Sequence, residues 1–159
     1  MKRLKYVMTM IGIASATPNH ALADLSLKIL SCPQNINSTI TNPPPVITVT
    51  VQAINNDCSK SVTLTSWFRG RVGNSYGTLQ LYGPYVYNFS TPRTVPKAIC
   101  SSQYGYEYVQ TPGVLNIGLP FAQTMFPAAL NNTLAILSAG VKTSTGDIKA
   151  TTCVVTVLP

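Results

Sequence analysis

Catalysis can be tested on this chain by asking which reactive side chains it contains. The only histidine, His20, lies in the N-terminal segment that we expect to be removed, so the mature chain offers no Ser-His-Asp or Cys-His arrangement. No mature lysine follows a serine by three positions, and no G-x-x-x-x-G-K-[ST] phosphate loop is present. The sequence therefore predicts a protein that is not an enzyme and that binds no cofactor.

The acidic residues leave one hydrolytic alternative open. Glycosidase chemistry uses a pair of carboxylates, and beyond Asp24 the chain offers only Asp57, Glu107 and Asp147. Asp57 and Asp147 fall in expected turns, whereas Glu107 lies in an expected strand between two tyrosines. We interpret Glu107 as an exposed strand residue and keep, as an alternative, a small periplasmic hydrolase or inhibitor that acts through it.

The cysteines predict covalent cross-links and no metal site. The four are Cys32, Cys58, Cys100 and Cys153. An even number in an exported chain predicts two disulfides. Their spacings of 26, 42 and 53 residues contain no C-x-x-C pair, so a zinc site is not expected. Three pairings are compatible with the sequence, and we favour the simplest local closures, Cys32–Cys58 and Cys100–Cys153.

The N-terminus has the features of a secretory leader. A basic start is followed by an apolar run at 6–16 and by the small residues ALA at 21–23, which predicts a signal peptide over residues 1–23. The apolar run is about half of the ~20 residues that span a bilayer, so we expect no integral membrane segment. The protein is thus expected to be exported, to the periplasm, the cell surface or the extracellular space.

The predicted mature chain, residues 24–159, suits a single domain. It has 136 residues, 159 less the 23 of the leader, which is long enough to bury a sizeable core. Three of the eleven basic residues leave with the leader, so eight basic residues face four acidic ones. Because these charges are scattered and form no run, nucleic-acid binding is not expected.

Apolar and polar residues alternate over most of the mature chain. The segment VITVTVQAI at 46–54 is the clearest example, with apolar residues on one face and Thr or Gln on the other, which is typical of a half-buried strand. Gly83-Pro84 predicts a turn between two strands, and TSTGD at 143–147 predicts a hairpin turn. A loop is expected at 120–132, and an extended approach at the prolines of 41–45. The other expected strands cover 25–30, 61–68, 77–82, 85–89, 104–109, 114–119, 133–143 and 147–157.

Many short strands separated by regular turns predict an all-β fold. We expect one immunoglobulin-like antiparallel β-sandwich of about 7–9 strands with two disulfides. The final pair of strands, LAILSAGVKTSTGDIKATTCVVTV, resembles the closing hairpin of an immunoglobulin-like domain. This resemblance is architectural and names no family.

Two sets of aromatic residues at every second position are candidate binding residues. Tyr85, Tyr87 and Phe89 share one face of an expected strand, and we favour a core-facing position for them. For Tyr104, Tyr106 and Tyr108 we leave burial and exposure open, because three buried phenolic hydroxyls would need three hydrogen-bond partners. Two arginines that flank Gly70 either border the same patch or lie in a solvated turn; they are Arg69 and Arg71.

These observations favour a non-enzymatic exported module for binding or assembly, of the kind found in adhesins and fimbrial appendage subunits. The alternative to it is a carbohydrate-binding module that uses the tyrosines. The partner is expected to be a protein or a glycan. Self-association through strand 24–30 is also open, with Leu25, Leu27 and Ile29 as the apolar contacts that such strand pairing would use.

Overall fold

The computed structural model of the chain describes residues 25–37, 46–74, 80–122 and 134–158. Within these ranges all regular structure is β-strand, and two disulfides are formed, so the all-β prediction is confirmed. No helix long and apolar enough to cross a membrane occurs in the described ranges. The predicted signal peptide, the prolines at 41–45 and most of the predicted loop at 120–132 lie outside them.

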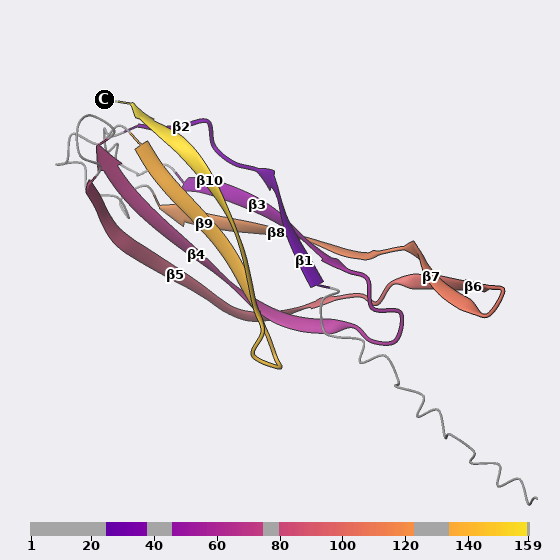
Figure 1. Cartoon of the computed structure of the whole chain (residues 1–159). Helices are drawn as coiled ribbons and strands as arrows, with labels where there is room; N and C mark the ends of the chain where they lie inside the picture. The colour runs from indigo at the N-terminus through magenta and orange to yellow at the C-terminus, as the bar shows by residue number, and fades with distance from the viewer. Residues whose placement is uncertain (1–24, 38–45, 75–79, 123–133, 159) are drawn as a thin grey trace, which may run out of the picture.

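The ten strands of the described residues form two larger sheets and one separate hairpin (Figure 1). Sheet A has the order β1 (Leu25–Ser31), β3 (Val46–Asn55) and β8 (Gly113–Ala122). Sheet B has the order β2 (Asn35–Asn37), β10 (Ile148–Leu158), β9 (Leu134–Thr143), β4 (Val62–Asn74) and β5 (Gln80–Val95). The hairpin joins β6 (Ile99–Gln103) to β7 (Tyr106–Thr111). The immunoglobulin-like arrangement of these strands stays a prediction.

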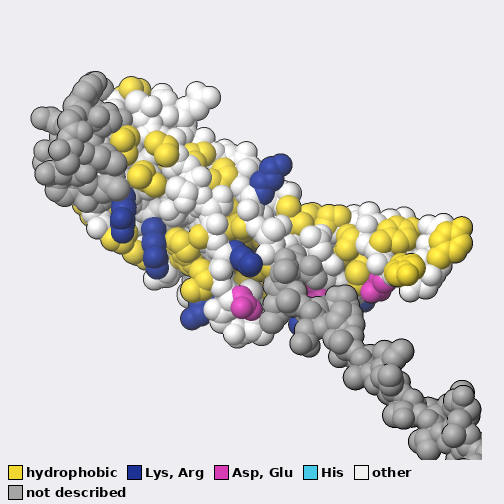
Figure 2. All heavy atoms as spheres, viewed as in Figure 1, with side chains coloured by type: hydrophobic (Ala, Val, Ile, Leu, Met, Phe, Trp, Pro, Cys, Tyr) yellow, Lys and Arg dark blue, Asp and Glu magenta, His cyan; other side chains and the backbone are white. Residues whose placement is uncertain are grey.

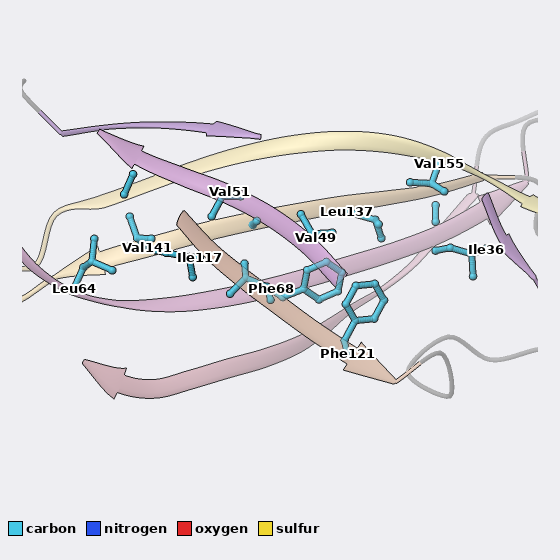
Figure 3. Close-up of a cluster of buried hydrophobic side chains, with 14 of the residues drawn as sticks. Ile36, Val49, Val51, Leu64, Phe68, Ile117, Phe121, Leu137, Val141 and Val155 are labelled. Carbon is cyan, nitrogen blue, oxygen red and sulfur yellow. The ribbon is translucent and has the colours of Figure 1, made fainter. Parts of the chain in front are cut away.

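The core lies between sheets A and B, where the alternating residues of both sheets meet. Val49, Val51 and Ala53 of β3 are buried, as the alternation in VITVTVQAI predicts. The rings of Phe68 on β4 and Phe121 on β8 stack with centroids 4.1 Å apart, so these two residues join the sheets (Figure 3). This packing of apolar side chains between the two layers is the main stabilising contribution to the fold.

The first strand belongs to its own domain. β1 pairs antiparallel with β3, with Leu25 opposite Asn55, and Leu25, Leu27 and Ile29 face the core. The chain then crosses between the sheets, and β2 pairs parallel with the end of β10, where Ile36 is buried. The three apolar side chains that would mediate strand exchange are therefore occupied within the chain.

The disulfide pairing that we favoured from the sequence is wrong. Cys32 bonds Cys153, and Cys58 bonds Cys100. The first bond fastens the crossing between β1 and β2 to β10, across a sequence separation of 121 residues. The simplest closures in sequence failed as a guide because β10, the last strand, returns to lie beside the first ones.

The predicted turn at Gly83-Pro84 is also wrong, since β5 runs without interruption from Gln80 to Val95. β5 is the outermost strand of sheet B, and an outermost strand tolerates a proline because its missing N–H can face away from the neighbouring strand. The register between β4 and β5 also shifts between Gly70 and Val72, which is the position of a bulge. The peptide bond Gly83–Pro84 is cis, and Gly83 has a φ of 108°.

The predicted closing hairpin is confirmed. β9 and β10 pair antiparallel, and the turn between them is closed by hydrogen bonds from the N–H of Thr143 to the carbonyl of Asp147 at 2.9 Å and from the N–H of Gly146 to the carbonyl of Thr143 at 3.0 Å. Gly146 takes a φ of 99°, which glycine adopts without steric cost.

Candidate functional site

A hairpin projects from the end of the two-sheet body (Figure 1). It consists of β6, β7 and the turn between them, residues 99–111, and we call it the arm. Within the described residues, β6 and β7 pair only with each other. Tyr104 and Gly105 form the turn with φ values of 53° and 82°, the positive values of a two-residue type I′ hairpin. The expected strand at 104–109 therefore begins later, at Tyr106, and Tyr104 lies in the turn instead.

The three tyrosines of the arm are exposed, which resolves the alternative that the sequence left open. Tyr104 is 90% exposed, Tyr106 78% and Tyr108 49%. Every residue of β7 is exposed, on both faces of the strand. Figure 2 shows apolar and aromatic side chains along the arm to its tip. The arm therefore presents aromatic rings to solvent, and among the described residues no second sheet covers it.

The base of the arm is held by the buried side chain of Asn55. Its Nδ2 donates hydrogen bonds to the carbonyls of Lys60 and Pro96, both at 3.0 Å, and its Oδ1 accepts one from the N–H of Asp57 at 3.0 Å. One amide thus ties the loop after β3 to the segment that enters the arm. Its burial without these partners would carry a cost of roughly 1–3 kcal/mol.

Two further contacts fix the same junction. The N–H of Ala98 donates to the carbonyl of Asp57 at 2.8 Å, and the disulfide Cys58–Cys100 links the loop covalently to β6. Gly113, where β8 begins, lies so close to the carbonyl of Pro96 that no Cβ would fit there. The arm is therefore exposed along its length and restrained at its base.

Asp57 organises the loop at this junction. Its Oδ1 accepts hydrogen bonds from the N–H and hydroxyl of Ser59, at 2.7 and 2.5 Å, and from the N–H of Lys60 at 3.2 Å. The hydroxyl of Ser59 is the main cause that lowers the pKa of Asp57 below its ordinary value of 3.8, and the two backbone N–H groups and the Lys60 ammonium act in the same direction against desolvation. The Lys60 ammonium lies 4.0 Å from Oδ2.

A hollow of about 620 Å³ lies at the base of the arm and is lined by residues that include Asp57, Glu107 and Asp147. Two of these carboxylates are engaged in turns: Asp57 as above, and Asp147 through the hydroxyl of Thr145 at 2.8 Å. Glu107 is exposed on β7. The hollow thus brings these three acidic residues of the described chain to one region at the base of the arm.

Glu107 also lies near the disulfide at the base of the arm. Its carboxylate and the sulfurs of Cys58 and Cys100 lie within 4.8 Å of one another. Because both sulfurs are bonded in the disulfide, they offer no thiolate to a metal ion. This cluster therefore provides no metal site in the oxidised protein.

The first aromatic set lies in the body and not on the arm. Tyr85 and Phe89 pack against the core from β5, as favoured from the sequence, while Tyr87 is 50% exposed. The rings of Tyr87 and Phe89 contact each other with centroids 4.8 Å apart. Of the tyrosine candidates, the structure thus places Tyr104, Tyr106 and Tyr108 on the arm, and Tyr85 and Tyr87 on sheet B.

The two candidate arginines lie on a strand, so the alternative of a solvated turn is wrong. Arg69 and Arg71 are exposed on the outer face of β4 in sheet B, whereas Tyr104, Tyr106 and Tyr108 belong to the arm. The guanidinium carbon of Arg69 lies 4.6 Å from the centre of the Trp67 ring. On the neighbouring strand, Gly140 leaves the space that the indole fills, since a Cβ there would overlap the ring.

No protein-family model and no curated protein sequence matches the chain. Among solved structures, it is similar to Spo0M, a sporulation control protein from Bacillus subtilis, with 10% identity and a TM-score of 0.42 over 87% of this chain and 51% of that one. A beta-glucosidase from Listeria innocua gives 14% identity and a TM-score of 0.42 over 86% of this chain and 16% of that one. The CooA pilin subunit from enterotoxigenic Escherichia coli gives 13% identity and a TM-score of 0.34 over 86% of this chain and 99% of that one.

The chain thus spans about half of Spo0M and about a sixth of the beta-glucosidase. At these TM-scores the similarities indicate neither a family nor a function.

Proposed function

We propose that this protein is an exported, non-enzymatic binding module whose binding element is the arm. The observation that carries the proposal is the exposure of Tyr104, Tyr106 and Tyr108 on a hairpin whose base is fixed by Asn55 and by the disulfide Cys58–Cys100. Large apolar groups on a projecting element contribute nothing to a core, so their exposure favours a role in contacts with another molecule.

The composition of the arm fits recognition in physical terms. A tyrosine side chain offers a large contact area with few rotatable bonds, so little conformational entropy is lost when it is immobilised. The remaining residues of the arm include serines, glutamines and one glycine, which offer adaptable hydrogen bonds. The restrained base lowers the ordering cost further, because the direction of the arm is set before binding.

The arrangement of the body supports an immunoglobulin-like interpretation. The order β1-β3-β8 corresponds to strands A, B and E of such a domain, and the order β10-β9-β4-β5 corresponds to G, F, C and C′. The arm occupies the part of the chain between C′ and E. We infer that a recognition hairpin stands where strand D, the fourth strand of the first sheet, would otherwise lie.

Export and the absence of catalysis belong to the same proposal. Two disulfides persist in oxidising compartments, in agreement with the predicted signal peptide. Among the acidic residues of the described chain, Asp57 and Asp147 serve turns and Glu107 is exposed, which favours a binding role over hydrolysis. An adhesin or a subunit of a surface appendage is the kind of protein that combines these features.

The ligand of the arm is either a protein or a neutral glycan, and one observation favours the glycan. The arm carries no lysine or arginine, and its only charge is Glu107, so it is unsuited to an anionic ligand. Tyrosine rings can stack against the apolar faces of uncharged sugars. A protein partner would use the same rings as interface contacts.

The experiment compares the mature protein with the variant Tyr104→Ser/Tyr106→Ser/Tyr108→Ser. Both proteins are tested for binding to an array of defined neutral glycans. In a second assay both are cross-linked to intact cells, and the proteins bound to them are identified by mass spectrometry. We expect the variant to bind its ligand at least about tenfold more weakly, since interface aromatics commonly dominate the binding energy. Unchanged binding by the triple variant would refute the arm as the binding element.

The matched control is Tyr87→Ser. Tyr87 is exposed to the same degree as Tyr108, 50% against 49%, but it lies on β5 in the body. We expect this substitution to leave ligand binding unchanged. A loss of binding equal to that of the triple variant would move the site from the arm to sheet B.

A further inference from the structure

Sheet B carries most of the basic residues of the described chain and no acidic residue. The strands of this sheet contain neither Asp nor Glu. The three acidic residues of the described chain instead all line the hollow at the base of the arm. Charge is therefore segregated in this molecule, and sheet B is its positive part. The basic residues of the sheet are Arg69, Arg71, Arg93, Lys142 and Lys149.

Three of these cations lie on the outer face of sheet B, which points away from sheet A. Arg69 and Arg71 are exposed and alternate along β4 with buried residues of the core. Lys142 of β9 is exposed as well, and it pairs with Thr65 on the same face of β4. Among the described residues none of the three forms an ion pair, since the pair found there joins two residues of the loop after β3.

Exposed aliphatic side chains lie beside two of these cations. Val86 of β5 is directly opposite Arg69, and Ile148 of β10 is directly opposite Lys142. Residues directly opposite each other in an antiparallel pair share one face of the sheet. Val86 is 45% exposed and Ile148 60%.

A third aliphatic residue completes the pattern. Val154 of β10 lies in the same row across the sheet as Arg71, two strands away, and is 69% exposed. We call this surface the basic face; its residues are Arg69, Arg71, Lys142, Val86, Ile148 and Val154.

The mixture of side chains on the basic face indicates the chemistry of its partner. The three cations lie along about 20 Å of sheet B, because Lys142 is level with Thr65, six residues from Arg71. Anionic lipid headgroups move laterally in a membrane, so they can gather under cations at any spacing. The exposed aliphatic side chains can enter the boundary between headgroups and acyl chains, which a soluble polyanion does not offer.

We propose that the basic face binds the surface of a membrane that contains anionic phospholipids. The guanidinium and ammonium groups pair with lipid phosphates, and the three aliphatic side chains lie at the boundary of the acyl chains. The protein lies on the membrane and does not span it. This site goes beyond the binding role of the arm, which contributes none of its residues. The attraction is in part electrostatic, so it weakens with added salt.

The first test is flotation of the oxidised mature protein with two kinds of vesicle. One is phosphatidylcholine alone, and the other is phosphatidylcholine and phosphatidylglycerol in equal parts. We expect flotation with the anionic vesicles at low ionic strength, less at high ionic strength, and none with the neutral vesicles. No flotation with the anionic vesicles at low ionic strength would overturn the proposal. Equal flotation with both kinds would also overturn it, since the cations would then play no part.

Charge variants test whether the basic face makes the contact. Arg69→Gln/Arg71→Gln should weaken binding to the anionic vesicles at least about tenfold, and Lys142→Gln alone about fivefold. The matched control Lys28→Gln/Lys97→Gln removes the same charge at exposed positions outside sheet B, and should stay within about twofold of the wild type. A control that weakens binding as much as the arginine variant would make net charge responsible and overturn the proposal.

Aliphatic variants separate a lipid surface from a soluble polyanion. Both Ile148 and Val154 are exposed, so Ile148→Ser/Val154→Ser leaves the core intact. This variant should bind the anionic vesicles at least about fivefold more weakly than the wild type, and should bind soluble dextran sulfate as the wild type does. Unchanged binding to the vesicles would show that the face meets charge alone, and would overturn the lipid surface as its partner.

The chain contains its own reporter of the contact. Trp67 is its only tryptophan, and the ring lies on the outer side of β4, 4.6 Å from the guanidinium carbon of Arg69. Quenching of its fluorescence by neutral acrylamide should fall when the wild type binds the anionic vesicles, because the membrane covers this face. Binding without any change in quenching would place the contact on another surface and overturn the proposal.

This outcome can be told apart from failure of the proposed function. The variant Tyr104→Ser/Tyr106→Ser/Tyr108→Ser should float as the wild type does, and Arg69→Gln/Arg71→Gln should keep the ligand of the arm. Loss of flotation in the tyrosine variant alone would place the membrane contact on the arm and overturn the proposal for the basic face.

Discussion

Strands β8 and β7 obey similar sequence rules and meet different surroundings. β8 alternates between buried and exposed residues along its length, because its inner face packs against sheet B. β7 also places Tyr106 and Tyr108 on one face and Glu107 on the other, yet all its residues are exposed. A period of two thus predicts which residues share a face of a strand. Whether that face is buried depends on a second sheet packed against it, which among the described residues is present for β8 and not for β7.

The body and the arm differ in what their side chains contribute to folding. Interactions in the body contribute to the free energy of folding, since they remove apolar surface from water. The exposed side chains of the arm contribute little to that free energy and remain available for contacts with another molecule. Variants in the two regions should therefore change different measured quantities.

The largest expected effect comes from the core. Phe68→Ala removes a fully buried ring that stacks on Phe121, and we expect a loss of about 3–5 kcal/mol in the free energy of unfolding. Tyr106→Ala on the arm should change it by less than about 0.5 kcal/mol. Chemical denaturation of both variants measures the contrast, and equal losses would abolish the division between body and arm.

The disulfides sharpen the same division. Replacing either pair by serines should destabilise the protein by about 2–5 kcal/mol, and the loss of Cys32–Cys153 should cost about 1 kcal/mol more, because it closes the longer loop. Only the loss of Cys58–Cys100 should also weaken ligand binding, since that bond holds the base of the arm. The measurements are denaturant unfolding and the binding assay described above.

Mass spectrometry provides the check on the bonds themselves. The unreduced wild type should show no free thiol, and its peptides should link Cys32 to Cys153 and Cys58 to Cys100. Equal effects of both replacements on ligand binding would mean that the arm does not depend on its covalent attachment.

Much of the body could be predicted from the sequence, because alternation alone identifies its strands. The segments that form β3, β8, β9 and β10 were all expected as strands. Strand β6 was missed, since ICSSQ has no apolar alternation and becomes a strand by pairing with β7 across a two-residue turn. The disulfide pairing was missed because it depends on strands that are adjacent in space and distant in sequence.

The candidate site was predictable in part. The sequence identifies the tyrosines of the arm as candidates but does not decide their exposure, since no local pattern reports whether a second layer covers them. Arg69 and Arg71 were assigned to the same patch or to a turn, although the alternation of Thr63 and Thr65 continues through Trp67 to both arginines. The same period of two, followed beyond Phe68, places both arginines on the outer face of a strand.

A smaller effect is expected in the turn of the arm. Tyr104 has a φ of 53°, a value that asparagine and glycine adopt more readily than tyrosine. Tyr104→Asn should therefore stabilise the hairpin by up to about 1 kcal/mol and at the same time weaken ligand binding. Amide hydrogen exchange of residues 99–111 would slow by up to about fivefold for this gain. Unchanged ligand binding by Tyr104→Asn would mean that the tyrosine ring in the turn does not contribute to binding.

The smallest effect concerns the loop that holds the base of the arm, and its sign follows from the pKa of Asp57. The hydrogen bond from the Ser59 hydroxyl lowers this pKa in the folded protein, so the folded state binds fewer protons than the unfolded state at acidic pH. The stabilisation is therefore fully present above the ordinary value of 3.8 and is lost as the pH falls through the lower, folded-state value.

Asp57→Asn removes this titration while it keeps an oxygen that can accept the same hydrogen bonds. We expect its free energy of unfolding to fall less steeply on acidification than that of the wild type, by a difference below about 1 kcal/mol. Urea unfolding measured in steps from neutral pH into this acidic range would decide the point: parallel curves would show that Asp57 holds the loop through geometry alone, and that its charge contributes nothing to the restraint on the arm.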